Sequence, residues 1–266
     1  MKTRLLLFES YPKIRNQVAR IRHKITIPLS ASKLKNHQEK DIFIKNLPVL
    51  NCAGRFCLNP EFVEAIKHVD IFNSDIRVNR FTKKIKIKDQ ELLSKCVNEF
   101  SKVVPEFYSI FRPKSDEVDL GKHTLATFKN IVQHKDYKGL SKREKNVLNV
   151  VALGHDIIKS VDAGPMHPVI SAQLMKKRLE SQQMFESDIE LAVKLITHHH
   201  YSENILKGRK TYSDYADIFD QEEFHLLKIL IDSDIRAKRN FKSSRLVENA
   251  VFFEEQDRVF AQSILA

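Results

Sequence analysis

Histidines and carboxylates gather in the second half of this sequence, among residues that are mostly apolar. Eleven histidines occur in the chain, and eight of them follow residue 122. His155 and Asp156 stand side by side in residues 151–160 (VALGHDIIKS), which are otherwise almost wholly apolar. A buried ionised carboxylate is costly unless a partner compensates its charge. The first question is therefore what Asp156 pairs with, and whether His155 belongs to the same site.

Further polar positions recur at the starts and ends of apolar segments. Imidazole nitrogens and carboxylate oxygens together suit Zn²⁺, Mn²⁺, Fe or Ni²⁺. Several buried polar sites in one helical domain are costly unless they meet each other. A single histidine alone is more simply a surface or hydrogen-bonded core residue, so the prediction of a divalent-metal site depends on the set. Its members are His123, His155, Asp156, His167, the histidines 198–200, and Asp234.

The elements that must bring these residues together are helices. Only six glycines and eight prolines occur, and alternating β patterns are scarce, so we expect an all-α, mainly helical fold. Two capping boxes are predicted, Ser141 with Glu144 and Ser187 with Glu190. Pro60 is expected at the first helical position after Asn59. The expected helices begin at residue 60 and then cover residues 89–104, 120–134, 141–159, 167–180, 187–199, 221–239 and 244–263.

The segments between these helices suggest three regions. We expect a basic N-terminal segment (1–48), a helical N-terminal region (49–118) and a metal-site domain (119–266). Residues 81–88 (FTKKIKIK) are the best candidate for a short extended piece. Residues 112–119 (RPKSDEVD) have the composition of a linker. Residues 207–220 are polar and are expected to form a long loop, placed where an active-site lid would lie.

Charge is distributed unevenly along the chain. Residues 1–150 hold 30 lysines and arginines against 16 aspartates and glutamates, a net charge of +14, whereas residues 151–266 carry −3. This asymmetry favours an anionic partner such as RNA at the basic front, or else a solvated lysine-rich face. No apolar run approaches the roughly 20 residues that span a bilayer, and the start lacks a signal-peptide core. We therefore expect a cytoplasmic protein without a membrane span; the sequence does not indicate its oligomeric state.

Five motifs in one order resemble those of the HD-domain metal-dependent phosphohydrolases. They are KHTLATF, ALGHDIIK, MHPVISAQLM, VKLITHHH and IDSDIRA, between about residues 100 and 240. The family pattern after the His-Asp pair is His-Asp-x-Gly-Lys. Here Ile158 takes the glycine position and Lys159 is retained. Within the family the chain looks most like the C-terminal half of bacterial tRNA nucleotidyltransferases, where a proline-glutamate segment also precedes the first histidine. The nucleotidyltransferase head is missing, so we do not predict nucleotide addition.

The resemblance implies a helical HD-domain bundle with one or two divalent ions (Mn, Ni, Zn, Fe or Mg). Asp234 is preferred to Asp232 because the family's last aspartate is followed by x-Arg. His167 and either His198 or His199 match the extra ligands of members with two metals, and His200 matches least because the helix should end there. The implied ligands of the first ion are His123, His155, Asp156 and Asp234.

The implied activity is hydrolysis of a phosphomonoester or phosphodiester by a metal-activated water, which Asp156 would help to orient. The substrate would be a nucleotide or an RNA end, and the enzyme a 2′,3′-cyclic nucleotide phosphodiesterase, a nucleotidase or a phosphatase. Lys159 and Arg236 are the candidates for binding the phosphate. Their alternatives are a solvated helix end for Lys159 and a structural salt bridge for Arg236. The alternative function is a non-catalytic RNA- or tRNA-binding module that uses the basic N-terminal half.

Overall fold

The computed structural model describes residues 49–52, 55–58, 60–69, 71, 88–111, 120–161, 164–210 and 218–238. It is mainly helical, as the sequence predicts. Among the described helices, none offers an apolar stretch long enough to span a bilayer. The α-helices are α4 (Pro60–Ile66), α5 (Lys88–Val103), α6 (Leu120–Gln133), α7 (Lys142–Gly154), α8 (His167–Ser181), α9 (Glu186–His198), α10 (Tyr201–Leu206) and α12 (Gln221–Ala237). Two 3₁₀ helices, η1 (Pro105–Phe111) and η2 (Lys135–Gly139), lie between them.

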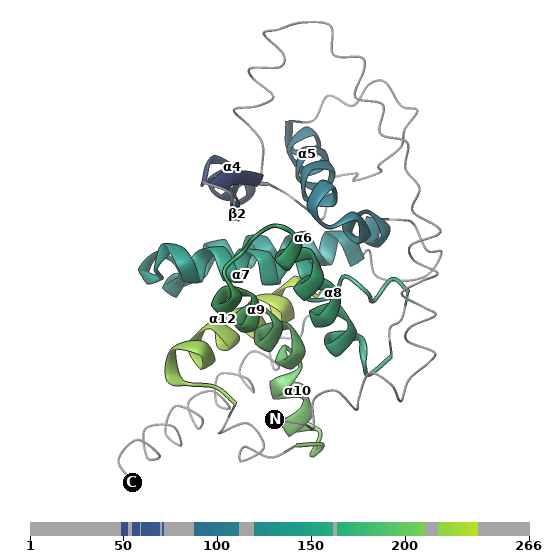
Figure 1. Cartoon of the computed structure of the whole chain (residues 1–266), viewed down its shortest axis with the longest axis vertical. Coiled ribbons are helices and arrows are strands. Elements are labelled where there is room, and N and C mark those ends of the chain that lie inside the picture. The colour runs from purple at the N-terminus through teal and green to yellow at the C-terminus, as the bar shows by residue number, and fades with distance from the viewer. Residues whose placement is uncertain are drawn as a thin grey trace, which may run out of the picture. The chain divides into compact units, whose positions relative to one another are not determined.

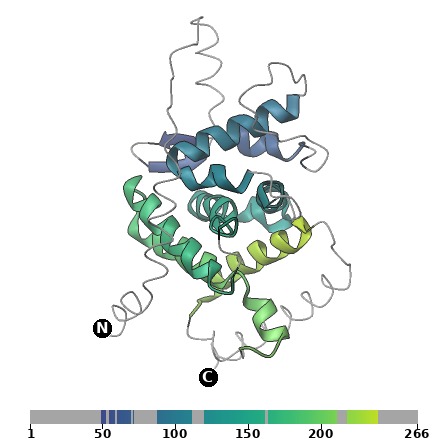
Figure 2. The same ribbon diagram turned by 90° about the vertical axis from the view of Figure 1, so that its right-hand side faces the viewer.

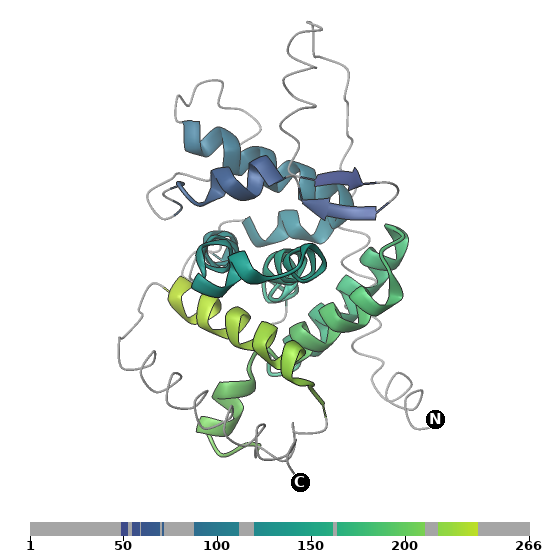
Figure 3. The same cartoon turned by 90° about the vertical axis from the view of Figure 1, so that its left-hand side faces the viewer.

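Helix α6 runs through the middle of the described bundle (Figure 1). It packs against α12 and α7, and η1 and α4 also contact it. In Figures 2 and 3, α12 lies on one side of α6 while α4 and α5 lie on the other. Leu125, Phe128 and Ile131 are fully buried because neighbours cover α6 on several sides. A residue of α6 that points towards α7 and α12 is therefore shielded from water.

A short hairpin departs from the helical region expected at residues 49–118. Strands β1 (Val49–Cys52) and β2 (Arg55–Leu58) pair antiparallel, with Val49 opposite Leu58 and Cys52 opposite Arg55. Only Ala53 and Gly54 separate the strands in the sequence, and a two-residue connection that contains glycine favours a hairpin. Of the extended piece expected at residues 81–88, only Lys88 is described, and it begins α5. The linker at residues 112–119, the helix at residues 244–263 and the basic segment 1–48 lie outside the described residues.

The helix starts agree with the sequence in part. The Ser141 capping box is confirmed: the Glu144 backbone N–H donates to Ser141 Oγ (3.2 Å), and the Ser141 N–H donates to Glu144 Oε2 (2.7 Å). The capping box predicted at Ser187 is wrong. Helix α9 begins one residue earlier, after Phe185, which provides no side-chain cap. Asp220 and Glu223 form a further capping box, not predicted from the sequence, at the start of α12.

The helix that was expected to reach Lys159 ends at Gly154. The His155 N–H still donates to the Val151 carbonyl, four residues back (2.8 Å). After it, the N–H groups of Ile157, Lys159 and Val161 each donate to a carbonyl three residues back. The chain therefore winds more tightly from Gly154 to Val161 than an α-helix does. His155 and Asp156 consequently stand at the junction of a helix and a turn rather than within a helix.

Close approaches and one buried ion pair fix the helices around that junction. A Cβ on Gly154 would lie 2.7 Å from Sδ of Met175, so the missing side chain lets α7 approach α8. Buried Glu106 of η1 accepts hydrogen bonds from two nitrogens of Arg178 in α8, one of them Nε at 3.0 Å. The proline-glutamate segment before the first histidine thus ties η1 to α8.

The contact between Gly121 and Phe111 predicts a cost for adding a methyl group beside His123. A Cβ on Gly121 would lie 2.8 Å from Cγ of Phe111 and closer still to two other ring carbons. We expect Gly121→Ala to lower the free energy of unfolding by about 1–3 kcal/mol, the usual cost of overpacking. Denaturant unfolding measures this difference.

Gly139→Ala is the matched control, because a Cβ there would meet no atom within 4 Å. We expect this control to change the stability by no more than about 0.5 kcal/mol. Equal stabilities for the two variants would show that the packing of Phe111 on Gly121 is not tight.

Candidate metal centre

Four buried side chains from three parts of the chain meet inside the bundle. His123 comes from α6, His155 and Asp156 from the end of α7, and Asp234 from α12, and their ligand atoms lie within 4.8 Å of one another. Asp234 Oδ1 is 2.8 Å from His123 Nε2 and 3.4 Å from His155 Nε2. Asp156 Oδ2 is 3.7 and 3.6 Å from the same two nitrogens. Tetrahedral ligands about 2.1 Å from one ion lie about 3.4 Å apart, so this four-residue group has the spacing of a metal site.

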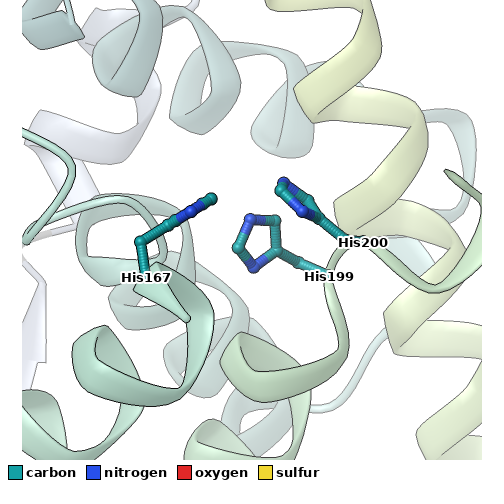
Figure 4. A group of neighbouring side chains, drawn as sticks. All are labelled: His167, His199 and His200. Atoms are coloured by element: carbon teal, nitrogen blue, oxygen red, sulfur yellow. The ribbon is translucent and has the colours of Figure 1, made fainter. Parts of the chain in front are cut away.

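Three histidines form a second group beside the first. His167 at the start of α8 faces His199 and His200, which follow the end of α9, and Figure 4 shows the three rings gathered around a common space. The ring centroids of His199 and His200 are 4.2 Å apart, and those of His167 and His200 are 4.9 Å apart. Three imidazoles that each offer one nitrogen within 4.8 Å of the others can hold a metal ion.

Asp156 lies between the two groups and faces both. Its Oδ1 is 3.1 Å from His167 Nε2 and 3.5 Å from His199 Nε2. Its Oδ2 faces His123 and His155 of the four-residue group. One carboxylate that offers an oxygen to each of two neighbouring sites is the arrangement that bridges a pair of metal ions.

The backbone orients the imidazole rings in the same way three times. Nδ1 of a histidine lies within hydrogen-bond distance of the carbonyl three residues earlier, and a carbonyl can only accept, so Nδ1 carries the proton. In the neutral ring the remaining nitrogen, Nε2, then presents its lone pair to the centre. Such hydrogen bonds fix the tautomer and the direction of metal-binding histidines. The pairs are His155 with Ala152 (2.9 Å), His167 with Gly164 (2.8 Å) and His199 with Ile196 (2.7 Å).

Several polar atoms that point into the centre have no hydrogen-bond partner among the described residues. They are Nε2 of His123, His155, His167 and His199, and Oδ1 of Asp156. His123 Nε2 lies close to Asp234, but the pair does not have hydrogen-bond geometry. Buried polar atoms are nearly always satisfied, so five orphaned atoms in one place need an explanation. Divalent cations within the two groups would satisfy all of them, and the donor atoms therefore fit a metal.

The electrostatics keep both carboxylates charged. Burial raises the pKa of Asp156, but the charge of His155 and contacts from His167 and His199 outweigh it and hold that pKa well below its usual range. Burial likewise raises the pKa of Asp234, but Lys238 and His123 outweigh it and hold that pKa well below its usual range. Two ionised carboxylates in a buried site require positive charge nearby.

The histidines divide into two electrostatic classes. Burial lowers the pKa of His199, and burial with the neighbouring charges of His199 and His167 lowers the pKa of His200 to about 3. These two imidazoles are neutral at neutral pH, which is the form that binds a metal. Burial also acts to lower the pKa of His155, but the charges of Asp156 and Asp234 outweigh it, and the pKa of His155 lies above its ordinary value.

Of the other residues expected at the site, some reach the centre and some lie outside it. Lys159 reaches the centre, with Nζ 2.9 Å from Asp156 Oδ2. His198 lies outside both groups, with its ring against Phe219. His200, the histidine that was least expected to bind a metal, lies in the second group with His167 and His199. The side chain of Ile158, at the glycine position, is buried and fills space in the core. Its backbone N–H donates to Ser171 Oγ of α8 at 3.4 Å.

Arg236, the second candidate for binding the phosphate, lies on another face of α12 than Asp234. Two helical residues in succession turn by about 200°, so the exposed Arg236 points away from buried Asp234. Lys238, four residues after Asp234, points the same way as the aspartate, and its Nζ lies 3.1 Å from Asp234 Oδ2. Lys238 was not among the expected residues, although its four-residue spacing from Asp234 is present in the sequence.

Residues 120–232 of the chain match the HD domain family. The matched part includes α6 to α9 and all but the last five residues of α12, and it ends two residues before Asp234. No curated protein matches the chain. The matched part of the chain therefore has the features of an HD domain of the metal-dependent phosphohydrolase type, with a His/Asp metal-site cluster formed by His123, His155, Asp156 and Asp234.

The geometry predicts the number of ions that each variant retains. We expect the wild-type protein to bind two divalent ions per chain, Asp156→Ala to bind neither tightly, and His200→Ala to keep the ion of the four-residue group. His198→Ala is the control from the same histidine run and should keep both ions, because its ring lies outside the two groups. Elemental analysis after dialysis measures the content. Retention of both ions by Asp156→Ala would contradict a bridging carboxylate.

The raised pKa of His155 predicts that metal binding releases protons. His155 is partly protonated near neutral pH in the metal-free protein, and a cation must displace that proton to bind Nε2. Metal affinity should therefore increase as the pH rises through the pKa of His155. Proton release should vanish well above that pKa. Calorimetry in two buffers with different ionisation enthalpies counts the protons, and no release at pH 7 would show that His155 is already neutral.

Proposed function

We propose that this HD-domain phosphohydrolase hydrolyses a phosphate ester of a nucleotide or an RNA end with two divalent ions. The observation that carries the proposal is the position of Asp156, whose two carboxylate oxygens each face one group of histidines. One ion would be held by the four-residue group and the other by His167, His199 and His200. The predominance of imidazole ligands favours Zn²⁺, Fe or Ni²⁺, with Mn²⁺ next, over Mg²⁺.

Divalent ions held by these residues would lower the pKa of a water molecule and polarise the phosphoryl oxygen. The chain itself holds the ligands still, because three histidines are fixed by backbone carbonyls. It also excludes water from the ligand side of the site, since Asp156 and Asp234 are both buried. The partly exposed lysines beside these carboxylates favour entry of the phosphate from their side of the site.

Lys159 is proposed to bind the substrate phosphate. In the structure its ammonium group pairs with Asp156 Oδ2, the oxygen that would bind an ion of the four-residue group. Once that oxygen binds a cation, Lys159 needs another negative partner. Its side chain is partly exposed, so the ammonium group can reach an incoming anion. A phosphoryl oxygen meets this requirement.

The proposed chemistry fits more than one class of phosphate ester. A 2′,3′-cyclic nucleotide phosphodiesterase, a nucleotidase and a phosphatase each fit the proposed chemistry. The net charge of +14 on residues 1–150 favours an RNA-borne substrate, because lysines and arginines that neutralise phosphates bind RNA. The likeness to the C-terminal half of tRNA nucleotidyltransferases points the same way. If the affinity for RNA did not fall from low to high salt, the proposal of an RNA-borne substrate would be contradicted.

The proposal predicts that hydrolysis and metal binding are lost together. We expect the metal-loaded protein to hydrolyse an aryl phosphate or a nucleotide. Asp156→Ala should lower kcat/KM by more than about 100-fold, since even outer partners of metal ligands are worth about 10–100-fold. A panel of nucleotides and RNA ends with Mn²⁺, Ni²⁺, Zn²⁺ and Fe²⁺ measures the activity, and circular dichroism checks the fold. Equal inactivity of wild type and variant across the panel would remove the enzymatic function.

A further inference from the structure

A second lysine, Lys238, reaches the metal centre from the end of α12. Its Nζ lies 3.1 Å from Asp234 Oδ2, while Oδ1 of the same carboxylate faces His123 and His155. Asp234 therefore offers one oxygen to the metal group and the other to a lysine. The Lys238 side chain is 38 % exposed and Asp234 only 6 %, so the ammonium group stands where the buried site meets solvent.

Lys238 opposes the binding of metal ions. A positive charge beside a ligand carboxylate repels an incoming cation and lowers the affinity of the site. Lys159 has the same relation to Asp156, with its Nζ 2.9 Å from Oδ2. Neutralising Asp234 in the metal-free protein would explain Lys238, but that need disappears once a cation is bound. A lysine that remains at a cation-loaded site calls for an anion.

The charges around the centre describe that anion. Two divalent ions exceed the carboxylates of Asp156 and Asp234 by two positive charges, and Lys159 and Lys238 raise the excess to four. Glu203, a further carboxylate near Lys238, is itself paired with Lys207. A hydroxide removes one positive charge from this excess. A terminal phosphate carries nearly two negative charges above its second pKa of about 6, whereas a phosphodiester carries one.

We infer that Lys238 binds the phosphate group of the substrate and that it favours a dianionic terminal phosphate over a monoanionic phosphodiester. This inference rests on the proposed function and narrows its substrate class. In the resting protein Asp234 holds the lysine, and the substrate phosphate replaces Asp234 as its partner. Lys238 would contact the substrate directly, so it is a binding residue and not a metal ligand.

Binding of inorganic phosphate at pH 8 tests the inference without catalysis. The probe is inorganic phosphate added to the metal-loaded full chain in a calorimeter. We expect Lys238→Gln to weaken phosphate binding by about 10- to 100-fold, the usual worth of a charge-assisted hydrogen bond. Lys238→Arg should retain most of the affinity. Metal content should be unchanged or higher in Lys238→Gln, because a repulsive charge is removed.

Lys176→Gln is the matched control for this measurement. Lys176 lies in α8, is 43 % exposed and pairs with the carboxylates of Glu180 and Glu186, so its exposure and pairing resemble those of Lys238. We expect its phosphate affinity to equal that of the wild type. Loss of metal from Lys238→Gln with unchanged phosphate affinity would overturn the inference, because Lys238 would then support Asp234 alone. Failure of the wild type to bind phosphate would overturn it as well.

Kinetics with two synthetic esters test the preference for a dianion. A mono-aryl phosphate carries two negative charges at pH 8 and a bis-aryl phosphate carries one. Lys238→Gln should raise KM at least about 10-fold for the monoester and less for the diester. Equal losses for the two esters would overturn the preference. If the wild type hydrolyses neither ester but binds phosphate through Lys238, the proposed activity fails while Lys238 remains an anion-binding residue.

Discussion

Asp156 holds a negative charge in the centre of the bundle, and the surrounding structure compensates that charge. The side chain is 1 % exposed, and His123, His155, His167, His199 and Lys159 surround it. Removing one partner from a buried charge costs about 3–5 kcal/mol. Four separate parts of the chain therefore have to arrive at this carboxylate. Its two oxygens face different histidine groups, which is why one aspartate can organise two sites.

The packing of the helices serves that convergence. The absence of a side chain at Gly154 lets α8 approach α7, and the same approach brings His167 towards the pair at the end of α7. The tighter winding after Gly154 carries His155 and Asp156 out of the α-helix. Glu106 and Arg178 then fasten η1 to α8 beside the site.

The positive side chains around the centre have a different purpose from the ligands. Neutral histidines such as His199 attract a cation, but Lys159 and Lys238 repel it. Each lysine neutralises a carboxylate in the metal-free protein, and a bound cation removes that need. Both lysines are partly exposed and lie next to buried carboxylates, so among the described residues they place positive charge at the boundary between the centre and solvent. The proposed phosphate contacts, Lys159 and Lys238, thus lie directly beside the metal ligands Asp156 and Asp234.

The sequence by itself determined the helical class and which helices carry the chemistry. Periodicity located α6 to α9 and α12, and the capping box at Ser141 fixed one helix start, because both signals are local. The order of the motifs also indicated that His123, His155, Asp156 and Asp234 belong together. The structure places the ligand atoms of these four residues within 4.8 Å of one another.

Only the tertiary structure decided which side chains face the centre. Helix α7 ends at Gly154, and the close packing of Gly154 on Met175 of α8 is a contact between helices that local sequence does not reveal. The choice of His200 over His198 follows from how the chain turns between α9 and α10, which a run of three identical residues does not encode. Arg236 and Lys238 differ in direction because one lies about half a turn, and the other about one full turn, beyond Asp234. Composition and motif order name the groups that do chemistry, whereas packing at a distance in the sequence decides where each one points.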